Sequence, residues 1–283
     1  MRSLILSAFI ISILFATGCQ PNNKDSHQNN ESEKARLKKD TAFSKQKTKY
    51  NPLMLAVVYQ QLAAEKYALE YQAYNLAKMA LKADLEDKNI NTQRAVILDI
   101  DETVLDNSPY EAMLVKKDTT YPAKWDKWLK KSNAKLIAGV KDFLNYAKNY
   151  GVDIFYLTNR KEQFRNSTLK NLQKYDLPQA DSDHLLMRTS TSSKKTRRNI
   201  IEKDYHISLL IGDNLNDFSH IFEEKSNREK KQLVDQHRDK FGKRFIVLPN
   251  AMYGDWETAT YNYDFSLSQQ EKYQKMLEQL NSF

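Results

Sequence analysis

The chain has 283 residues, 41 % of them hydrophobic and 11 % aromatic, which is enough to bury a core and excludes a wholly disordered chain. Its formal net charge of +8 is compatible with an anionic membrane, nucleic acid or small anionic substrates. The lysines are scattered rather than gathered in a stripe, and the sequence contains no known nucleic-acid-binding motif, so we expect no nucleic-acid partner.

The N-terminus resembles the leader of a bacterial lipoprotein. After one positive charge, residues 4–16 form an apolar run that is too short to span a bilayer easily, and Gly18 directly precedes Cys19, the only cysteine. We therefore predict a lipoprotein signal peptide over residues 1–18 and a lipid on Cys19. Lipoprotein signals most often carry leucine where this chain has Ala16, so an ordinary secretory signal or a short membrane anchor is the alternative.

A lipid on Cys19 makes the chain a membrane-anchored lipoprotein of the cell envelope. Gln20, which follows the cysteine, is not an aspartate and by analogy indicates the outer membrane if the host has one. Residues 19–50 are polar and lack apolar periodicity, so we predict a flexible tether. No cysteine is left for disulfides, and the folded domain over residues 51–283 must be held together by its core.

That domain is expected to begin with a helical segment over residues 51–90. Apolar residues recur at three- and four-residue steps through residues 53–85, which indicates one long amphipathic helix or two joined ones. The segment carries a stripe of tyrosines that includes Tyr67, Tyr71 and Tyr74. Such a stripe either packs into the core or offers a ligand surface.

The remainder of the chain alternates short apolar runs with helix-like periods. We predict strands at residues 95–100, 152–157, 185–187, 208–211 and 245–248, and helices at residues 137–150, 163–175, 195–204, 218–240 and 268–280. This alternation predicts an α/β fold, in which helices cover both faces of a parallel sheet. Ligands of such sheets bind beyond the carboxyl ends of the strands.

Polar residues gather at those strand ends. They are Asp99 and Asp101 after the first strand, Thr158 and Asn159 after the second, and Asp213 and Asp217 after the third strong one. Four acids would repel one another beside a core unless a cation lies among them. Because all the available ligands are oxygens, the sequence predicts Mg²⁺.

This set of residues suits reactions at phosphorus. Asp99 and Asp101 are two residues apart and point the same way on an extended chain, so one can attack phosphorus while the other handles protons. Mg²⁺ on Asp99 and Asp213 would offset the repulsion between a carboxylate and a phosphate dianion. A lysine from residues 192–198 can neutralise the remaining charge.

These residues also carry a family resemblance. Residues 99–103 resemble the first motif of the haloacid dehalogenase (HAD) superfamily, and the second, third and fourth motifs are matched by Thr158, by Lys194 and by Gly212-Asp213 with Asp217. The longer strings at residues 98–110 and 211–218 resemble the two signatures of class C acid phosphatases, a family that includes lipoprotein 5′-nucleotidases. The strings at residues 125–128 and 249–257 fit the same family, and the resemblance covers residues 52–265.

The resemblance implies a Rossmann-like parallel sheet of the HAD type with a mainly helical cap or additional segment. It makes residues 51–283 a phosphatase domain that hydrolyses phosphate monoesters, nucleotides among them, through a phosphoaspartate with Mg²⁺. It also suggests a homodimer. The alternatives are a phosphotransferase, in which an acceptor alcohol replaces water, and a non-catalytic lipoprotein that binds a ligand.

The same resemblance assigns the catalytic roles. Asp99 becomes the nucleophile and Asp101 the acid that later acts as a base. Thr158 and Asn159 hydrogen-bond the phosphoryl oxygens. Lys194 is preferred to Lys195 because it directly follows two serines and stands three residues before paired arginines.

The resemblance also assigns the metal ligands and a substrate clamp. Mg²⁺ is held by the Asp99 and Asp213 carboxylates and the Asp101 backbone carbonyl; Asp217 supports the metal shell, orients Lys194 or only caps a helix. Arg160 is left as a cap or an ion-pair partner. A base or aromatic leaving group would stack on aromatic side chains, which could equally be core residues: Tyr110, Trp125, Trp128, Tyr253 and Trp256.

Overall fold

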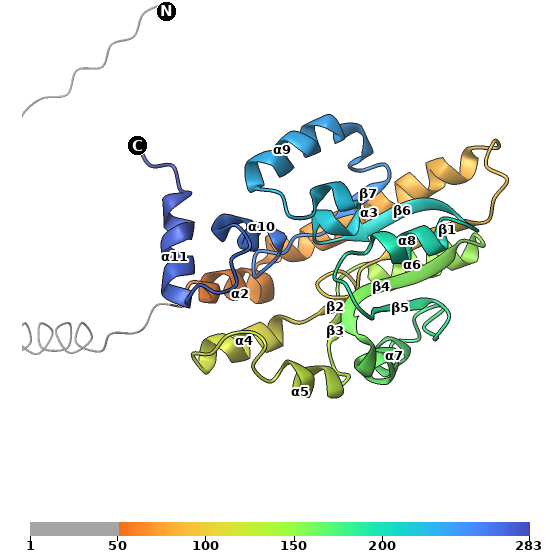
Figure 1. Cartoon of the computed structure of the whole chain (residues 1–283). Coiled ribbons are helices and arrows are strands. Elements are labelled where there is room, and N and C mark those ends of the chain that lie inside the picture. Colours follow the sequence, from red (N-terminus) through yellow and green to blue (C-terminus); the bar gives the residue numbers. More distant parts are fainter. Residues whose placement is uncertain (1–50) are drawn as a thin grey trace, which may run out of the picture. The chain divides into compact units, whose positions relative to one another are not determined.

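The computed structural model describes residues 51–283; the signal peptide, the tether and Cys19 of the sequence predictions lie outside the described residues. The described part opens with helices α2 (Leu53–Leu62) and α3 (Ala64–Glu86) (Figure 1). Ala63 between them is extended, with ψ at 122°, so the helical segment consists of two joined helices. Within residues 51–283, no helix combines the length and the apolar character that crossing a membrane requires.

The centre of the domain is a five-stranded parallel sheet with the order β5-β4-β1-β6-β7. Its strands are β1 (Arg94–Leu98), β4 (Asp153–Lys161), β5 (Leu185–Arg188), β6 (His206–Gly212) and β7 (Phe245–Val247). All five predicted strands are present, and the α/β fold class is confirmed. Strand β4 runs four residues further than predicted, so Thr158 and Asn159 lie within the carboxyl-terminal half of the strand rather than after it.

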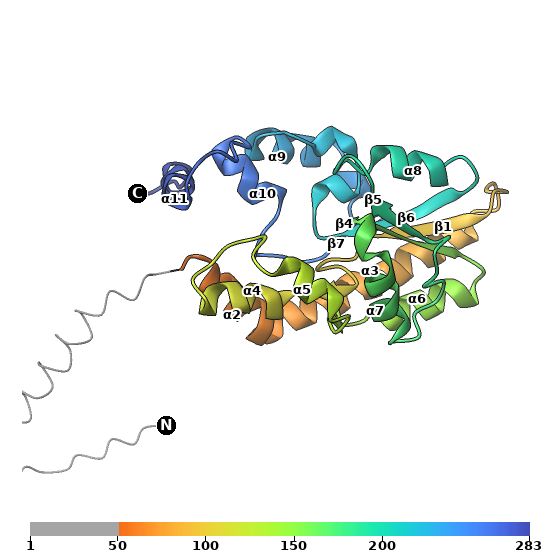
Figure 2. The ribbon, with the colours of Figure 1, turned by 60° about the horizontal axis from the view of Figure 1, so that its bottom comes forward.

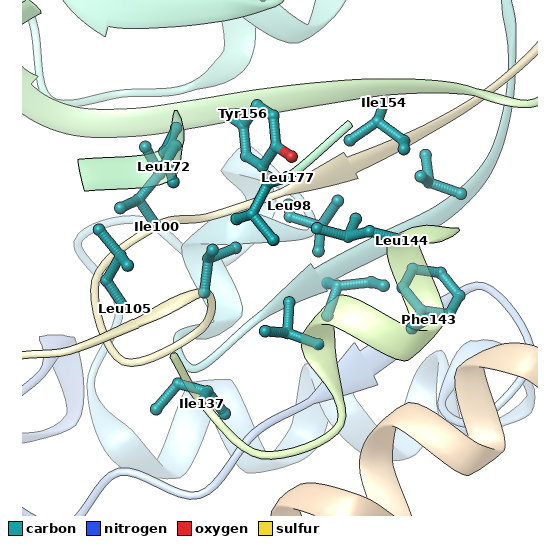
Figure 3. Close-up of a cluster of buried hydrophobic side chains, with 14 of the residues drawn as sticks. Leu98, Ile100, Leu105, Ile137, Phe143, Leu144, Ile154, Tyr156, Leu172 and Leu177 are labelled. Atoms are coloured by element: carbon teal, nitrogen blue, oxygen red, sulfur yellow. The ribbon is translucent and has the colours of Figure 1, made fainter. Parts of the chain in front are cut away.

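Both faces of the sheet are covered, which explains the continuous apolar runs of its strands. On β1, Val96 and Leu98 point into the larger core with α3, α6 (Val140–Asn149) and α7 (Arg165–Gln173) (Figures 2 and 3). The alternate residues of β1 point into a smaller core on the other face, where α8 (Lys195–Ile201) packs. Strand β1 is therefore buried on both sides, and the residues that follow it emerge at the centre of the sheet edge.

A helical insertion follows β1 and corresponds to the mainly helical additional segment of the prediction. Helices α4 (Ser108–Lys116) and α5 (Trp125–Lys130) lie between two short antiparallel strands, β2 (Leu105–Asp106) and β3 (Lys135–Leu136). The pairing of β2 with β3 returns the chain to the sheet, so the insertion begins and ends close to the end of β1.

The prediction of a largely helical segment over residues 218–240 is wrong in detail. The structure has one α-helix there, α9 (Asn227–Gln236), with short 3-10 turns before and after it. The side-chain hydroxyls of Ser219 and Ser226 accept hydrogen bonds from backbone N–H groups and start a new turn each time, which interrupts a continuous helix. The chain ends with α10 (Asp255–Thr258) and α11 (Gln269–Glu278).

Candidate active site

The carboxyl ends of β1 and β6 bring together acids that are far apart in the sequence. The backbone N–H of Asp99 donates to the carbonyl of Ile211 at 2.9 Å, so the chain stays paired with β6 one residue beyond β1. Asp213 directly follows β6. Carboxylate oxygens of Asp99, Asp213 and Asp217 lie within 4.8 Å of one another. These acids thus meet where the sequence analysis expected a ligand site.

Lys194 lies between two of these acids. Its Nζ donates to Asp99 Oδ1 and, at 2.7 Å, to Asp217 Oδ1. Burial lowers the pKa of Lys194, but the two carboxylates more than offset that effect and raise it, so the ammonium stays charged. The next residue, Lys195, is exposed. Of the two lysines, only Lys194 reaches the acids.

Asp217 uses both carboxylate oxygens in the structure. Oδ1 accepts from Lys194, and Oδ2 accepts from the backbone N–H of Asn214 at 3.0 Å, which caps the 3-10 turn Leu215–Asp217. Asp217 can therefore cap this turn and orient Lys194 at the same time. A Cβ on Gly212 would lie 2.3 Å from Asp217 Oδ2, so only glycine allows this close approach. A part for Asp217 in the metal shell stays a prediction.

Asp101 stands apart from that group and is held by two other side chains. Arg160 donates to Asp101 Oδ1 through Nη2 at 2.7 Å and Nε at 3.0 Å, and Asn107 Nδ2 donates to the same oxygen at 2.7 Å. Of the two alternatives for Arg160, the structure favours the ion-pair partner. The Asp101 carboxylate is not part of the group formed by Asp99, Asp213 and Asp217, and a role for its backbone carbonyl as a metal ligand stays a prediction.

Thr158 and Asn159 are fastened to α8 by an arginine that sequence reasoning did not assign. Arg197 donates to the Thr158 carbonyl at 2.6 Å and to Asn159 Oδ1 at 2.7 Å. Its neighbour Arg198 donates to the carbonyls of Asn216 at 3.0 Å and Asp217 at 2.9 Å. The paired arginines therefore join α8 to the end of β4 and to the turn that follows β6. Their place three residues after Lys194 was the only sequence signal for this role.

The donor set fits a hard divalent cation. Three carboxylates share one ammonium, so the cluster lacks positive charge. Burial raises the pKa of Asp99 to about 7 and that of Asp213 well above its ordinary value, with the Asp217 charge adding to both shifts. Asn250, which was not assigned, donates to Asp213 Oδ2 at 2.8 Å and fixes that carboxylate. All the available ligands are oxygens, as Mg²⁺ requires.

The aromatic residues of the expected clamp fall into different environments. Tyr110 is 2 % exposed and its ring lies 4.8 Å from that of Trp125, so its burial favours the core alternative. Trp125 and Trp128 are half-buried against the larger core. Tyr253 is half-buried, whereas Trp256 is 44 % exposed.

Trp256 lines a cavity of about 560 Å³ that extends from Asp213 to α9. Asp213 and Asn214 form one side of this cavity, and Lys231 and Asp235 of α9 form another. The cavity connects an exposed indole to a residue of the acid cluster, which keeps Trp256 among the candidates for substrate contact.

Comparisons with known proteins agree with this geometry. Residues 19–256 match the family model described as HAD superfamily, subfamily IIIB (acid phosphatase). The chain is similar to the class C acid phosphatase from Bacillus anthracis, with 42 % identity and a TM-score of 0.79 over 82 % of this chain and 97 % of that one. For a second structure of that enzyme, with tungstate bound, the identity is 41 % and the TM-score 0.78, again over 82 % of this chain and 97 % of that one.

The similarity extends to a plant protein. Over 135 residues, the chain is 29 % identical to acid phosphatase 1 of Solanum lycopersicum. The matched part is 43 % of this chain and spans half the length of that protein.

Proposed function

Because the chain belongs to the acid phosphatases of the HAD superfamily, subfamily IIIB, we propose that it hydrolyses phosphate monoesters through a phosphoaspartate on Asp99 with Mg²⁺ bound. One observation carries this proposal. The Asp99 carboxylate lies against Lys194 and close to Asp213, and Asp101 stands two residues further on, held outside that cluster. A nucleophile, a positive charge for the phosphoryl group and a separate proton donor are thus present together.

The reaction proceeds in two steps. In the first, an oxygen of Asp99 forms a bond to phosphorus, the bond to the ester oxygen breaks, and Asp101 transfers its proton to that oxygen to release an alcohol. In the second, Asp101 takes a proton from water as the water oxygen bonds to phosphorus. The bond between phosphorus and Asp99 then breaks, inorganic phosphate leaves, and both carboxyl groups return to their initial states.

The surrounding residues bind the phosphoryl group. Lys194 neutralises equatorial charge, and Thr158 and Asn159 offer hydrogen-bonding groups at the end of β4. Mg²⁺, held by the carboxylates of Asp99 and Asp213 and the backbone carbonyl of Asp101, offsets the repulsion between the dianionic ester and the nucleophile when it is bound.

We place nucleotides among the substrates. The exposed indole of Trp256 and the half-buried rings of Trp125, Trp128 and Tyr253 support a stacked base or aryl group. The test is phosphate release from nucleotides, alkyl phosphates and aryl phosphates by the chain from residue 24 onward, at pH 5 and pH 7. Release would establish a phosphomonoesterase. If the alcohol appears without an equal amount of phosphate, an acceptor takes the phosphoryl group instead. If the enzyme reacts with none of the esters, the proposal is refuted.

Removal of the metal is expected to abolish phosphate release, and Mg²⁺ is expected to restore it. Protons compete with the metal for Asp99 and Asp213, whose pKa values burial raises, so half-saturation should need more Mg²⁺ at pH 5 than at pH 7. Activity is measured after treatment with a chelator and then during titration with Mg²⁺, using Na⁺ at equal ionic strength as the control. Full activity after exhaustive chelation would remove the metal from the scheme.

We also propose that Cys19 carries a lipid that anchors the chain in the cell envelope, in an outer membrane if the host has one. The support is the leader, with its short apolar run and Gly18 before Cys19. Cys19→Ser is expected to release active enzyme from the membrane fraction. Attachment that persists in this variant would mean that another part of the chain anchors it.

A homodimer also stays a prediction. Its support is the apolar face of α2, where Leu55 and Leu62 are 65 % and 77 % exposed. Contiguous exposed apolar side chains are common at contacts between subunits.

A further inference from the structure

We propose that Trp128 is a positioning residue for the proton donor: its indole N–H fixes the amide of Asn107 in the one orientation that donates to Asp101. This inference rests on the proposed function, in which Asp101 protonates the leaving oxygen. It gives Trp128 a part other than the stacking expected from the family resemblance.

The contacts form a chain from α5 to the end of β1. Trp128 Nε1 donates to Asn107 Oδ1 at 2.8 Å, and Asn107 Nδ2 donates to Asp101 Oδ1 at 2.7 Å. The side chain of Glu102 holds the other side of Asn107, accepting from its backbone N–H at 2.8 Å and from Nδ2 at 3.3 Å. Asn107 is fully buried, so water cannot replace these partners.

The indole determines which end of the amide faces the acids. An amide has a carbonyl that only accepts and an NH₂ group that only donates, and the two ends have nearly the same shape. Because an indole N–H can only donate, it requires the carbonyl of Asn107 and leaves the NH₂ group for Asp101 and Glu102. Without that N–H, the amide can rotate by half a turn and place its oxygen against two carboxyl groups.

The amide also helps to select the oxygen of Asp101 that carries the proton. Oδ1 accepts three hydrogen bonds, from Asn107 Nδ2 and from Arg160 Nη2 and Nε. Oδ2 accepts only a longer one, from Arg160 Nε at 3.2 Å. Oδ2 is therefore the oxygen left to carry the proton that the proposed mechanism assigns to Asp101, and the contacts at Oδ1 orient it. Loss of the Asn107 donor would leave Arg160 as the only one of these donors on Asp101, so the orientation of the carboxyl group would be less closely fixed.

The test compares esters whose alcohols differ in acidity. Protonation by Asp101 matters most for an alkyl phosphate, because an alkoxide leaves poorly, and least for p-nitrophenyl phosphate. Trp128→Phe keeps an aromatic ring and removes the N–H. We expect kcat/KM for an alkyl phosphate to fall about 10-fold or more, a part of the roughly 10²- to 10⁴-fold that a general acid contributes, and kcat/KM for p-nitrophenyl phosphate to change less than about 3-fold.

Lys127→Met is the control, since Lys127 belongs to the same helix and is exposed. This change should leave the ratio of the two kcat/KM values as it is in the wild type. If Trp128→Phe likewise changes both esters equally, or changes neither, the indole does not position the acid and the inference is overturned.

A second variant covers the case in which Trp128→Phe does not fold. Asn107→Ala alone should show the same selective loss for alkyl esters, and an equal change for both esters would overturn the inference. Where Trp128→Phe does fold, adding it to Asn107→Ala should change the ratio of the two kcat/KM values no further. An additional selective loss in the double variant would overturn the inference, because Trp128 would then act by another route. The wild-type enzyme is also assayed with p-nitrophenyl phosphate. If the proposed function is wrong, the wild type hydrolyses neither ester, which distinguishes that failure from failure of this inference.

Discussion

Asp99→Asn is expected to abolish phosphate release, with kcat lowered about 10⁴-fold or more, as for the loss of other enzymatic nucleophiles. An amide cannot form a phosphoaspartate, and it is a weaker ligand for a metal ion. The fold should persist, because the amide has the size of the carboxyl group and removes one of three negative charges from a buried cluster. Phosphate release and thermal unfolding of the purified variant are the two measurements.

Asp204→Asn is a suitable control for this variant, because Asp204 is exposed at the end of α8. Its activity and melting temperature should equal those of the wild type. Turnover by Asp99→Asn at a tenth of the wild-type rate, with deamidation excluded by mass spectrometry, would mean that another group attacks phosphorus.

Lys194→Met is expected to lower kcat about 10²- to 10³-fold, the range that follows the loss of one preorganised donor from an active site. The ammonium donates hydrogen bonds to both Asp99 and Asp217. Its removal leaves two buried carboxylates without this cation, so the free energy of unfolding should also fall, by about 3–5 kcal/mol in the absence of metal. Kinetics and denaturation in urea, each with and without Mg²⁺, measure the two effects.

Lys195→Met provides the matched comparison, since the same substitution is made one residue away on an exposed side chain. We expect little change in rate or stability there. Equal losses in the two variants would show that the net charge near the site matters rather than the position of Nζ, and the assignment of Lys194 would fail.

The sheet and the acid cluster were predictable from sequence because each depends on a local pattern. The part of a strand that is buried on both faces must be apolar, as residues 95–98 of β1 are, and acids directly after such strands have few structural explanations. Parallel pairing then brings the ends of β1 and β6 together, whatever the length of chain between them. Asp99 and Asp213 could therefore be placed at one site without knowledge of any contact.

The contacts that orient these acids could not be predicted in the same way. Arg160 and Asp101 are 59 residues apart, and Trp128 reaches Asn107 from a helix of the insertion. No periodicity specifies such pairs. An arginine or a tryptophan within a family string has several possible roles, and only the side-chain geometry distinguishes stacking from donation by the indole N–H.

The helical error over residues 218–240 has a different cause. The charged residues of this segment favour helix as a group, but a serine hydroxyl can bond to the backbone and begin a new turn, as Ser226 does before α9. Helix propensity summed over a long stretch of sequence does not predict where a single serine begins a new turn.

The central claim is that phosphate passes through a covalent bond to Asp99, and trapping that bond tests it most directly. Enzyme turning over a phosphate monoester with Mg²⁺ would be quenched in acid, reduced with borohydride and digested, and its peptides compared with those of Asp99→Asn. An acyl phosphate is reduced to an alcohol, so we predict homoserine in place of aspartate at position 99 of the wild type and at no other carboxylate. A reduced residue at Asp101 or Asp213, or no reduced residue in enzyme that releases phosphate rapidly, would contradict the mechanism.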